Sequence, residues 1–163
     1  MAFWTENTAA PQRKFRFRIQ MGSEIMWWAK SVTQPSPDIS VSEYQLINHK
    51  IKYPGIVTWN DIDITLVDIG DKGQKLLFDL ESYGYDFRDT LKDGVSKIKS
   101  DVGVPRELFQ LLIIKYDDEG DIIETWTLIN PFFKAIKYGD LEYSSDELLE
   151  VTLTVAYDSA TLT

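Results

Sequence analysis

Cysteine is absent from the 163-residue chain, and histidine occurs only once. The first absence excludes disulfides, thiolate metal sites and cysteine nucleophiles. A serine–histidine–aspartate triad would have to be built around His49, which lies in a mostly polar stretch, and the chain has no nucleophile elbow. It also lacks a glycine-rich phosphate loop and a zinc-ligand spacing. We therefore expect neither an enzyme nor a bound cofactor or metal.

Two acidic clusters come closest to a cation site. They are the Asp61–Asp63 pair and the turn that begins at Asp117. The turn departs from the calcium-loop pattern, because Ile122 stands where that loop needs glycine. An acidic hairpin tip also keeps a turn solvated, and we favour that simpler interpretation.

Long apolar runs are missing as well. No segment approaches the ~20 apolar residues that a membrane-spanning helix needs, and the N-terminal residues do not resemble a signal peptide, so we expect no membrane contact. The formal charge is −9, from 26 acidic and 17 basic residues, which disfavours ordinary nucleic-acid binding. A hydrophobic content of 44% and an aromatic content of 13% predict one folded domain over residues 1–163, with β-structure and large interfaces.

Period-two alternation of apolar and polar residues indicates half-buried strands. It predicts strands over 13–21, 56–69 and 147–158, a strand over 25–32 that returns from a turn at 22–24, and a hairpin of 107–116 and 122–129. Residues 72–83 instead have helical spacing, with Asp71 as the expected N-cap and Gln74 as its capping-box partner. Seven or eight strands and one helix predict a mainly β fold, a β-sandwich or partly open barrel with one flanking α-helix.

Residues 39–55 form an unusual segment between the Pro35–Pro37 loop and a turn signal at 53–55. The segment is β-prone, but its apolar residues are too sparse for a core of its own. It is either an arm that contacts another subunit or a long, flexible surface hairpin, and the pattern alone favours neither. If it is an arm, its candidate contact residues are Val41, Tyr44, Ile47, Ile51 and Tyr53.

Two regions resemble the tail tube proteins of phages with contractile tails. One is 51–68, with the core TWNDIDITLVD, followed by the helix. The other comprises Asn130-Pro131-Phe132-Phe133, the segment KYGDLEYSSDE over 137–147, and a terminal strand that ends in Tyr157-Asp158. The resemblance covers most of the chain, apart from the weakly patterned stretch 87–104 and the unusual Phe3-Trp4.

The resemblance implies a structural virion protein whose hexameric rings stack into a tube inside a contractile sheath. Such a tube is assembled in the cytoplasm of the host bacterium from a baseplate, follows a tape-measure protein, ends at a terminator and conducts DNA without binding it. The strands of neighbouring subunits would continue into one closed barrel. Candidate channel-lining acids are Asp61, Asp63 and Glu150, and the rival placement turns them outward, towards a basic sheath.

The large aromatic residues exceed the obvious needs of one small core, so some are candidate interface anchors. They are Trp27, Trp28, Trp59, Trp126, Phe132 and Phe133, and core packing is the alternative for each of them. Two neighbouring hypotheses are a baseplate protein that initiates the tube and a tube subunit of a phage-derived injection machine. A hypothesis of another class is a monomeric small-molecule-binding β-barrel with a closed cavity, and a further one is an acid–base hydrolase.

Overall fold

Strict alternation in two segments produces the centre of the fold. Strands β6 (Ile62–Val67) and β10 (Glu150–Ala156) each bury every second side chain. They pair antiparallel with Leu153 opposite Ile64, which puts all the buried side chains of both strands on one face. The buried set is Ile62, Ile64, Leu66, Val151, Leu153 and Val155. The opposite face of the two strands is consequently left polar.

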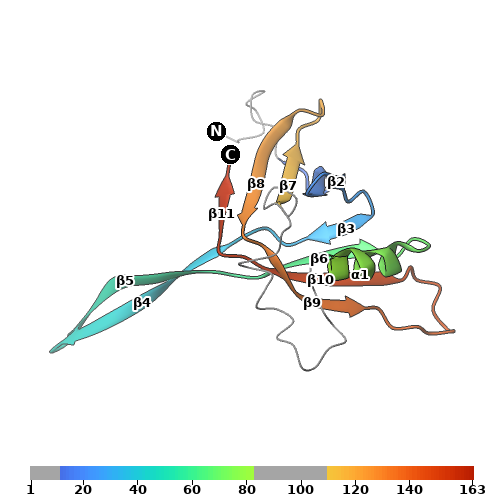
Figure 1. Ribbon diagram of the computed structural model, residues 1–163. Helices are drawn as coiled ribbons and strands as arrows, with labels where there is room; N and C mark the ends of the chain where they lie inside the picture. The colour runs from blue at the N-terminus through green and yellow to red at the C-terminus, as the bar shows by residue number, and fades with distance from the viewer. Residues whose placement is uncertain (1–11, 83–109) are drawn as a thin grey trace.

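The computed structural model describes residues 12–82 and 110–163 (Figure 1). Strands β3 (Ala29–Val32) and β9 (Phe132–Tyr138) complete a four-stranded sheet in the order β3-β6-β10-β9. A five-stranded sheet has the order β11-β8-β7-β1-β2, with bounds β11 (Ser159–Leu162), β8 (Ile122–Ile129), β7 (Leu111–Tyr116), β1 (Phe17–Met21) and β2 (Glu24–Ile25). Both sheets are open, so over the described residues the fold is mainly β, with one helix, and is not a closed barrel.

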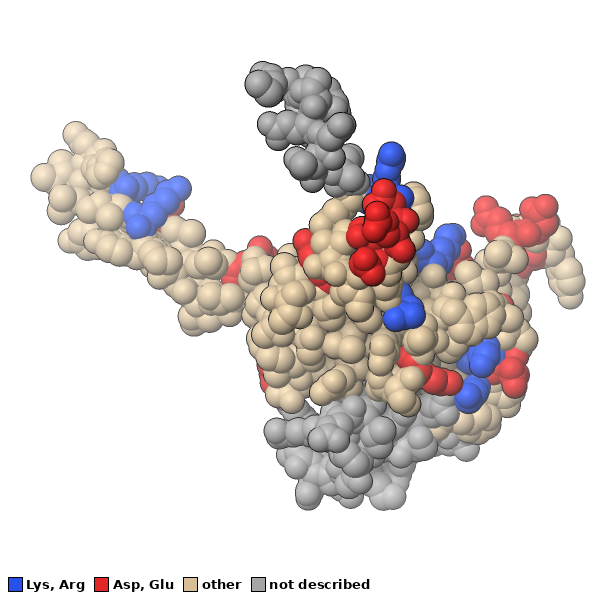
Figure 2. Space-filling model, turned by 90° about the horizontal axis from the view of Figure 1, so that it is seen from above, with Lys and Arg blue, Asp and Glu red and all other residues tan. Residues whose placement is uncertain are grey.

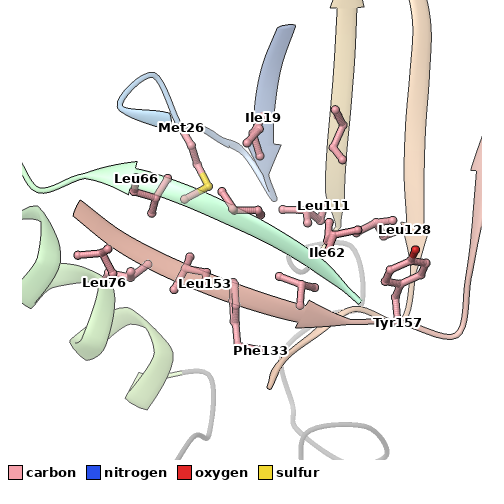
Figure 3. Packing of buried hydrophobic residues seen from close by; sticks show 14 residues of the cluster. Ile19, Met26, Ile62, Leu66, Leu76, Leu111, Leu128, Phe133, Leu153 and Tyr157 are labelled. Carbon is pink, nitrogen blue, oxygen red and sulfur yellow. The ribbon is translucent and has the colours of Figure 1, made fainter. Parts of the chain in front are cut away.

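The hydrophobic core lies between the two sheets (Figure 3). The five-stranded sheet contributes Ile19, Leu111 and Leu128, which lie above β6 and β10 in this view. Helix α1 (Lys72–Ser82) adds Leu76 to the same cluster, as its predicted apolar stripe requires. Among the described residues every buried side chain of the core is apolar, and none is charged.

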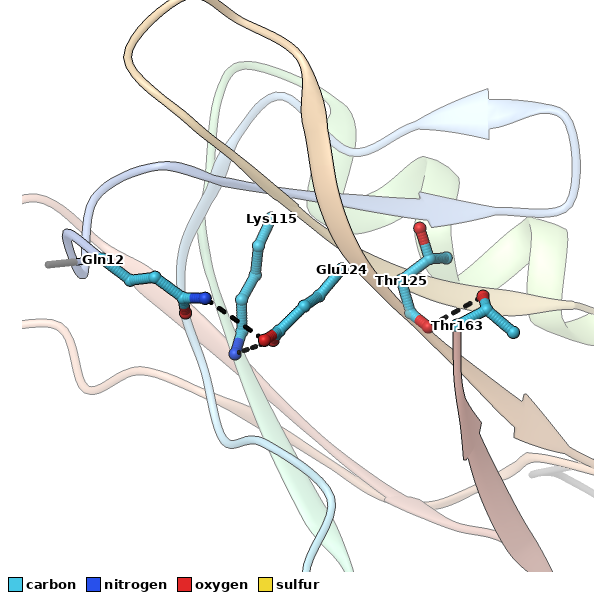
Figure 4. A network of polar contacts seen from close by, with 5 residues as sticks. All are labelled: Gln12, Lys115, Glu124, Thr125 and Thr163. Atoms are coloured by element: carbon cyan, nitrogen blue, oxygen red, sulfur yellow. Dashed lines mark hydrogen bonds and ion pairs between the residues drawn. The ribbon is translucent and has the colours of Figure 1, made fainter. Parts of the chain in front are cut away.

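Polar contacts join strands β7, β8 and β11 of the five-stranded sheet (Figure 4). Glu124 on β8 lies 2.8 Å from the ammonium group of Lys115 on β7 and accepts a hydrogen bond from Gln12 at 3.2 Å. The hydrogen bond from Lys115, followed by that from Gln12, lowers the pKa of the Glu124 carboxyl group. Thr163 and Thr125 exchange backbone hydrogen bonds of 3.0 and 2.8 Å, which tie the C-terminal strand to β8.

The helix begins as predicted at Lys72, and Asp71 holds the N-cap position, because its carbonyl accepts the Lys75 N–H at 2.9 Å. The side chain that caps the helix is nevertheless a different one. Asp68, not Asp71, accepts a hydrogen bond from a helical N–H, that of Gly73, at 3.1 Å. The side chain fits because Gly73 has no Cβ, which would lie only 3.0 Å from the Asp68 carboxylate oxygens. The sequence pattern thus located the N-cap position correctly, but the carboxylate that accepts a helical N–H comes from Asp68, three residues earlier.

The cap can be tested by substitution. Asp68→Ala should lower the free energy of unfolding by about 1 kcal/mol, because a helix N–H loses its acceptor. Asp71→Ala is the matched control and should cost much less. Urea denaturation of the isolated subunit measures both, and equal effects would contradict the assignment of Asp68 as the cap.

The 25–32 segment is not the single returning strand that was predicted. Only β2 returns along β1, and the chain then crosses to the other sheet as β3. The buried Met26 donates its N–H to the Ile19 carbonyl at 2.9 Å, which anchors the crossing in the core. The predicted strand is interrupted here because the Met26 side chain is buried in the core.

The predicted strand 56–69 is not continuous either, because residues 60–61 are not in a strand and β6 covers only 62–67. Other boundaries follow the predictions more closely. The β7–β8 hairpin is confirmed, with Asp117 accepting N–H bonds from Glu119 and Asp121 in its turn. The predicted strand 147–158 is shorter, at 150–156, and is followed by the unpredicted β11. Strand β9 was likewise not predicted. The stretches 1–11 and 83–109, which include Phe3-Trp4 and 87–104, lie outside the described residues.

Candidate functional site

A hairpin arm projects from the body of the subunit (Figure 1). It consists of β4 (Pro37–Leu46) and β5 (His49–Trp59), which pair only with each other among the strands of the structure. Every residue of β4 is exposed, and on β5 only Ile51 and Trp59 are half-buried. The segment is therefore an extended structure that has little contact with its own domain.

The tip of the arm lies elsewhere than predicted. Residues 53–55 are not a turn but lie inside β5, and the chain reverses at Ile47 and Asn48 between the paired Leu46 and His49. Ile47 takes a positive φ of 52° there. A bulge explains the misleading Pro54-Gly55 signal, because the hydroxyl group of Ser40 accepts the Ile56 N–H at 2.8 Å and the ladder shifts register.

The arm is amphipathic. Residues opposite each other in the ladder share a face, so one face carries an apolar set from both strands, namely Tyr44, Leu46, Ile51 and Tyr53. The other face carries Glu43 with Lys50 and Lys52, at 3.3 and 3.8 Å from its carboxylate oxygens. Of the remaining predicted contact residues, Val41 lies on this second face and Ile47 on the tip, 86% exposed.

The root of the arm is braced. The side-chain amide of Asn60 donates to the Asp38 carboxylate at 2.8 Å and to the Ser36 hydroxyl at 3.2 Å. The Asn60 N–H also donates to the Ser36 carbonyl at 3.1 Å. Trp59 packs against Tyr157 of the core with ring centroids 6.0 Å apart. The two strands thus leave the body held together by contacts from both sides.

The outward face of the four-stranded sheet is polar. Asp63 on β6 lies opposite Thr154 on β10 and accepts a hydrogen bond from its hydroxyl group at 2.7 Å. Glu150, at the start of β10, pairs with Lys30. Asp61 precedes β6 with the same parity as Asp63 and pairs with Lys134 of β9 at 2.7 Å. The structure thus places the three predicted acids on one face of the sheet, where Asp61 and Asp63 are exposed and Glu150 is half-buried.

This surface carries both signs of charge. Hydrogen bonding and charge attraction from Glu150 raise the pKa of Lys30, and those from Asp61 raise the pKa of Lys134. Lys137, also exposed, lies opposite Thr152 in the ladder. The sequence did not single out these lysines, because pairing between strands distant in the chain cannot be read from local alternation.

The aromatic candidates fall into different environments. Phe133 is 6% exposed and fills the core, which leaves little side-chain surface for a contact with another subunit. Trp28, Trp59 and Trp126 are partly buried against the core, and Phe132 is half-buried. Trp27 is 67% exposed, with its ring edge-on to that of Trp28 at 5.8 Å. It is the member of the set that offers most surface to a partner.

Other functional chemistry has little support. His49 is exposed near the tip of the arm, and within 12–82 and 110–163 no group of three or more His, Cys, Asp or Glu side chains is placed to hold a metal ion. No helix in this part of the chain is long and apolar enough to cross a bilayer. The sheets formed by the described strands do not close into the barrel that a small-molecule-binding protein of that class would have. The two exposed features that remain as candidate sites are the arm and the polar face of the four-stranded sheet.

Comparison with known proteins tests the fold. No protein family model and no curated protein sequence matches the chain. Among solved structures, the chain is similar to one in the sheath/tube terminator of an extracellular contractile injection system in its extended state, with TM-score 0.72, 18% identity and coverage of 96% of this chain and 99% of that one. A chain of the sheath–tube complex has TM-score 0.70, 18% identity and coverages of 96% and 93%.

A third similar chain comes from the baseplate of the anti-feeding prophage, with TM-score 0.70, 14% identity and coverages of 95% and 97%. The likeness spans nearly the whole of each chain. It shows that this protein has the tail tube fold, as the sequence resemblance predicted.

Proposed function

We propose that this chain is a tube subunit of a contractile tail or a related injection particle, whose copies form rings that stack into a hollow conduit. The arm carries the proposal, since it exposes an apolar face that its own described subunit does not cover. A two-stranded hairpin is marginally stable in water and gains stability when that face is covered. A second copy of the chain supplies the cover in an assembly.

The ring would form through the four-stranded sheet. Its outermost described strands are β3 and β9, and edge strands pair readily with another chain. In the proposed ring the sheet of each subunit continues into the next until the circle closes as one barrel. Six subunits would agree with the 6-fold symmetrised reconstruction that contains the similar baseplate chain. The exposed Trp27 is our candidate anchor at a subunit contact.

The polar face of the same sheet would line the channel. Threonines and ion pairs keep this face hydrated, and each of the acids Asp61 and Glu150 neutralises a lysine, so that a passing phosphate meets no excess of positive charge. Phosphate contacts supply most non-specific affinity, and the partnered lysines offer few free positive charges for them. DNA could therefore pass without being held.

The remaining partners follow from this assembly. The tube would contact a sheath, start at a baseplate, end at a terminator and enclose a tape-measure protein, as part of a virion tail assembled in a bacterial cytoplasm. The baseplate and terminator chains among the similar structures favour a second candidate, a tube-initiating or capping subunit. A tube subunit should polymerise alone, whereas an initiator or cap should stop at a single ring.

Negative-stain electron microscopy of concentrated purified protein tests the proposal. Tubes or stacked rings with a central hole are the expected result. Single rings would instead support the second candidate, a tube-initiating or capping subunit. A monodisperse monomer at high concentration would contradict both.

The channel face makes a separate prediction. Replacing Asp61, Asp63 and Glu150 with Lys should slow DNA ejection by about tenfold or more, because free lysines would bind passing phosphates. The measurement is the rate of DNA release from particles carrying the variant tube. The matched control makes the same charge change at Asp118, Glu119 and Asp121 in the exposed β7–β8 turn. Normal ejection with impaired sheath attachment would place the three acids on the outside of the tube instead.

A further inference from the structure

The loop between β9 and β10 exposes large apolar side chains. Over residues 139–149, Leu141 is 86% exposed, Leu148 72% and Tyr143 fully exposed. The same loop holds four acids and no base, namely Asp140, Glu142, Asp146 and Glu147. An exposed apolar group rimmed by charge is typical of an interaction surface.

The loop has a defined shape. The Gly139 N–H donates to the Glu150 carbonyl at 2.9 Å, which closes its base. A Cβ at position 139 would lie 2.8 Å from that carbonyl oxygen, so glycine is required there. Inside the loop the Ser145 N–H donates to the Glu142 carbonyl at 3.4 Å, and the Glu147 N–H donates to the Ser145 hydroxyl at 3.3 Å. A preformed loop loses less entropy when it binds.

The loop and the arm lie at opposite ends of the subunit. In Figure 1 the arm extends to the left of the body, and the connection from β9 to β10 reaches the far right. In Figure 2 lysines mark the arm on the left, and a group of acidic residues marks the opposite end. The two surfaces therefore cannot meet within one subunit, but they face each other when copies are placed head to tail.

Their chemistry is complementary. Both surfaces expose apolar side chains, which on the arm form the face of Tyr44, Leu46, Ile51 and Tyr53. Between residues 41 and 54 two lysines stand against one glutamate, whereas the loop itself holds four acids and no base. The ammonium groups of Lys50 and Lys52 sit on long flexible stems and can reach past the edge of the arm while its apolar face packs. On a chain of net charge −9 such a basic tip is directed to a strongly acidic target.

We propose that the arm of one subunit docks on the 139–149 loop of a subunit in the adjacent ring, with its apolar face on Leu141, Tyr143 and Leu148 and its lysines among the loop acids. This inference rests on the proposed function and names the surface that receives the arm. The contact joins two different patches, so it repeats without closing and extends the stack along its axis.

Charge exchange tests the pairing. One variant carries Lys50→Glu and Lys52→Glu, a second carries Glu142→Lys and Glu147→Lys, and a third combines all four changes. Each pair alone should reduce the amount of sedimentable tube at least tenfold, because like charges then meet. The combination should restore most of it, because the charges are again opposite. The control variant Asp118→Lys with Glu119→Lys makes the loop's charge change in the β7–β8 turn and should assemble as the unmodified chain does.

The outcomes separate the inference from the proposed function. All substituted side chains are exposed, so thermal unfolding should match that of the unmodified protein. If the loop variant forms normal tubes, the docking inference is wrong. If those tubes also fail to bind the sheath, the loop is a sheath-binding surface instead. A combined variant no better than the single pairs also overturns it, while wild-type tubes preserve the proposed function. Failure of the unmodified chain to form rings or tubes rejects the function itself.

Discussion

Shortening the arm should abolish tubes without unfolding the subunit. The register allows a clean design, because Val41 and Pro54 lie opposite each other and an Asn-Gly turn can replace residues 42–53 between them. The deletion removes the apolar set on one face and the lysines on the other. Since nearly all of the deleted side chains are exposed, the core should remain intact.

Two measurements decide this prediction. Electron microscopy should show rings or monomers and no tubes, a loss of at least a hundredfold in polymer by sedimentation. Thermal unfolding should stay close to that of the full chain, since no buried side chain is lost. The control Asn48→Gly keeps the full arm and should polymerise. Intact tubes from the shortened chain would refute an inter-ring role for the arm.

Truncation of a core side chain, in contrast to shortening of the arm, should reduce the stability of the subunit itself. Leu153 is completely buried on β10 between Ile64 of β6 and Ile136 of β9. Leu153→Ala should lower the free energy of unfolding by about 2–5 kcal/mol, because it removes buried methyl groups and leaves a cavity. That is a large part of the total for a domain of this size, so assembly should fail through loss of folded subunits.

Chemical denaturation with an unchanged m-value checks this prediction. The matched control is Thr152→Ala, on the adjacent outward-facing position of the same strand, and it should cost less than about 1 kcal/mol. A small effect at Leu153 would mean that the two sheets pack less closely than the buried cluster indicates. Reduced assembly with unchanged stability would place this side chain at an interface.

How many of the strands could be predicted from the sequence depended on how regularly apolar and polar residues alternate in each of them. Alternation in β6 and β10 is uninterrupted, and the β7–β8 turn has its own side-chain acceptor, so these elements were predictable. Strand β9 was missed because its ladder is irregular. Lys134 is an extra residue opposite the step from Thr154 to Val155, and this bulge breaks the period of two.

The candidate surfaces show the same limit. The arm could be located from its composition, but its two faces depend on a register set by a bulge at Ser40 and a turn at Ile47. The candidate channel acids could be selected by parity, but their lysine partners come from distant strands. The 139–149 loop was noticed only as part of a resemblance, since exposure of its apolar residues is a property of the folded chain.

The brace at Asn60 has a mechanical consequence. Hydrogen bonds from this residue to Ser36 and Asp38 fix the direction in which the hairpin leaves the sheet. If that hairpin joins successive rings, the angle at its base sets their rotational offset, and hence the helical pitch of the polymer. A tube whose subunits lacked the Asn60 hydrogen bonds would still grow, but as a filament of irregular twist that transmits torque poorly.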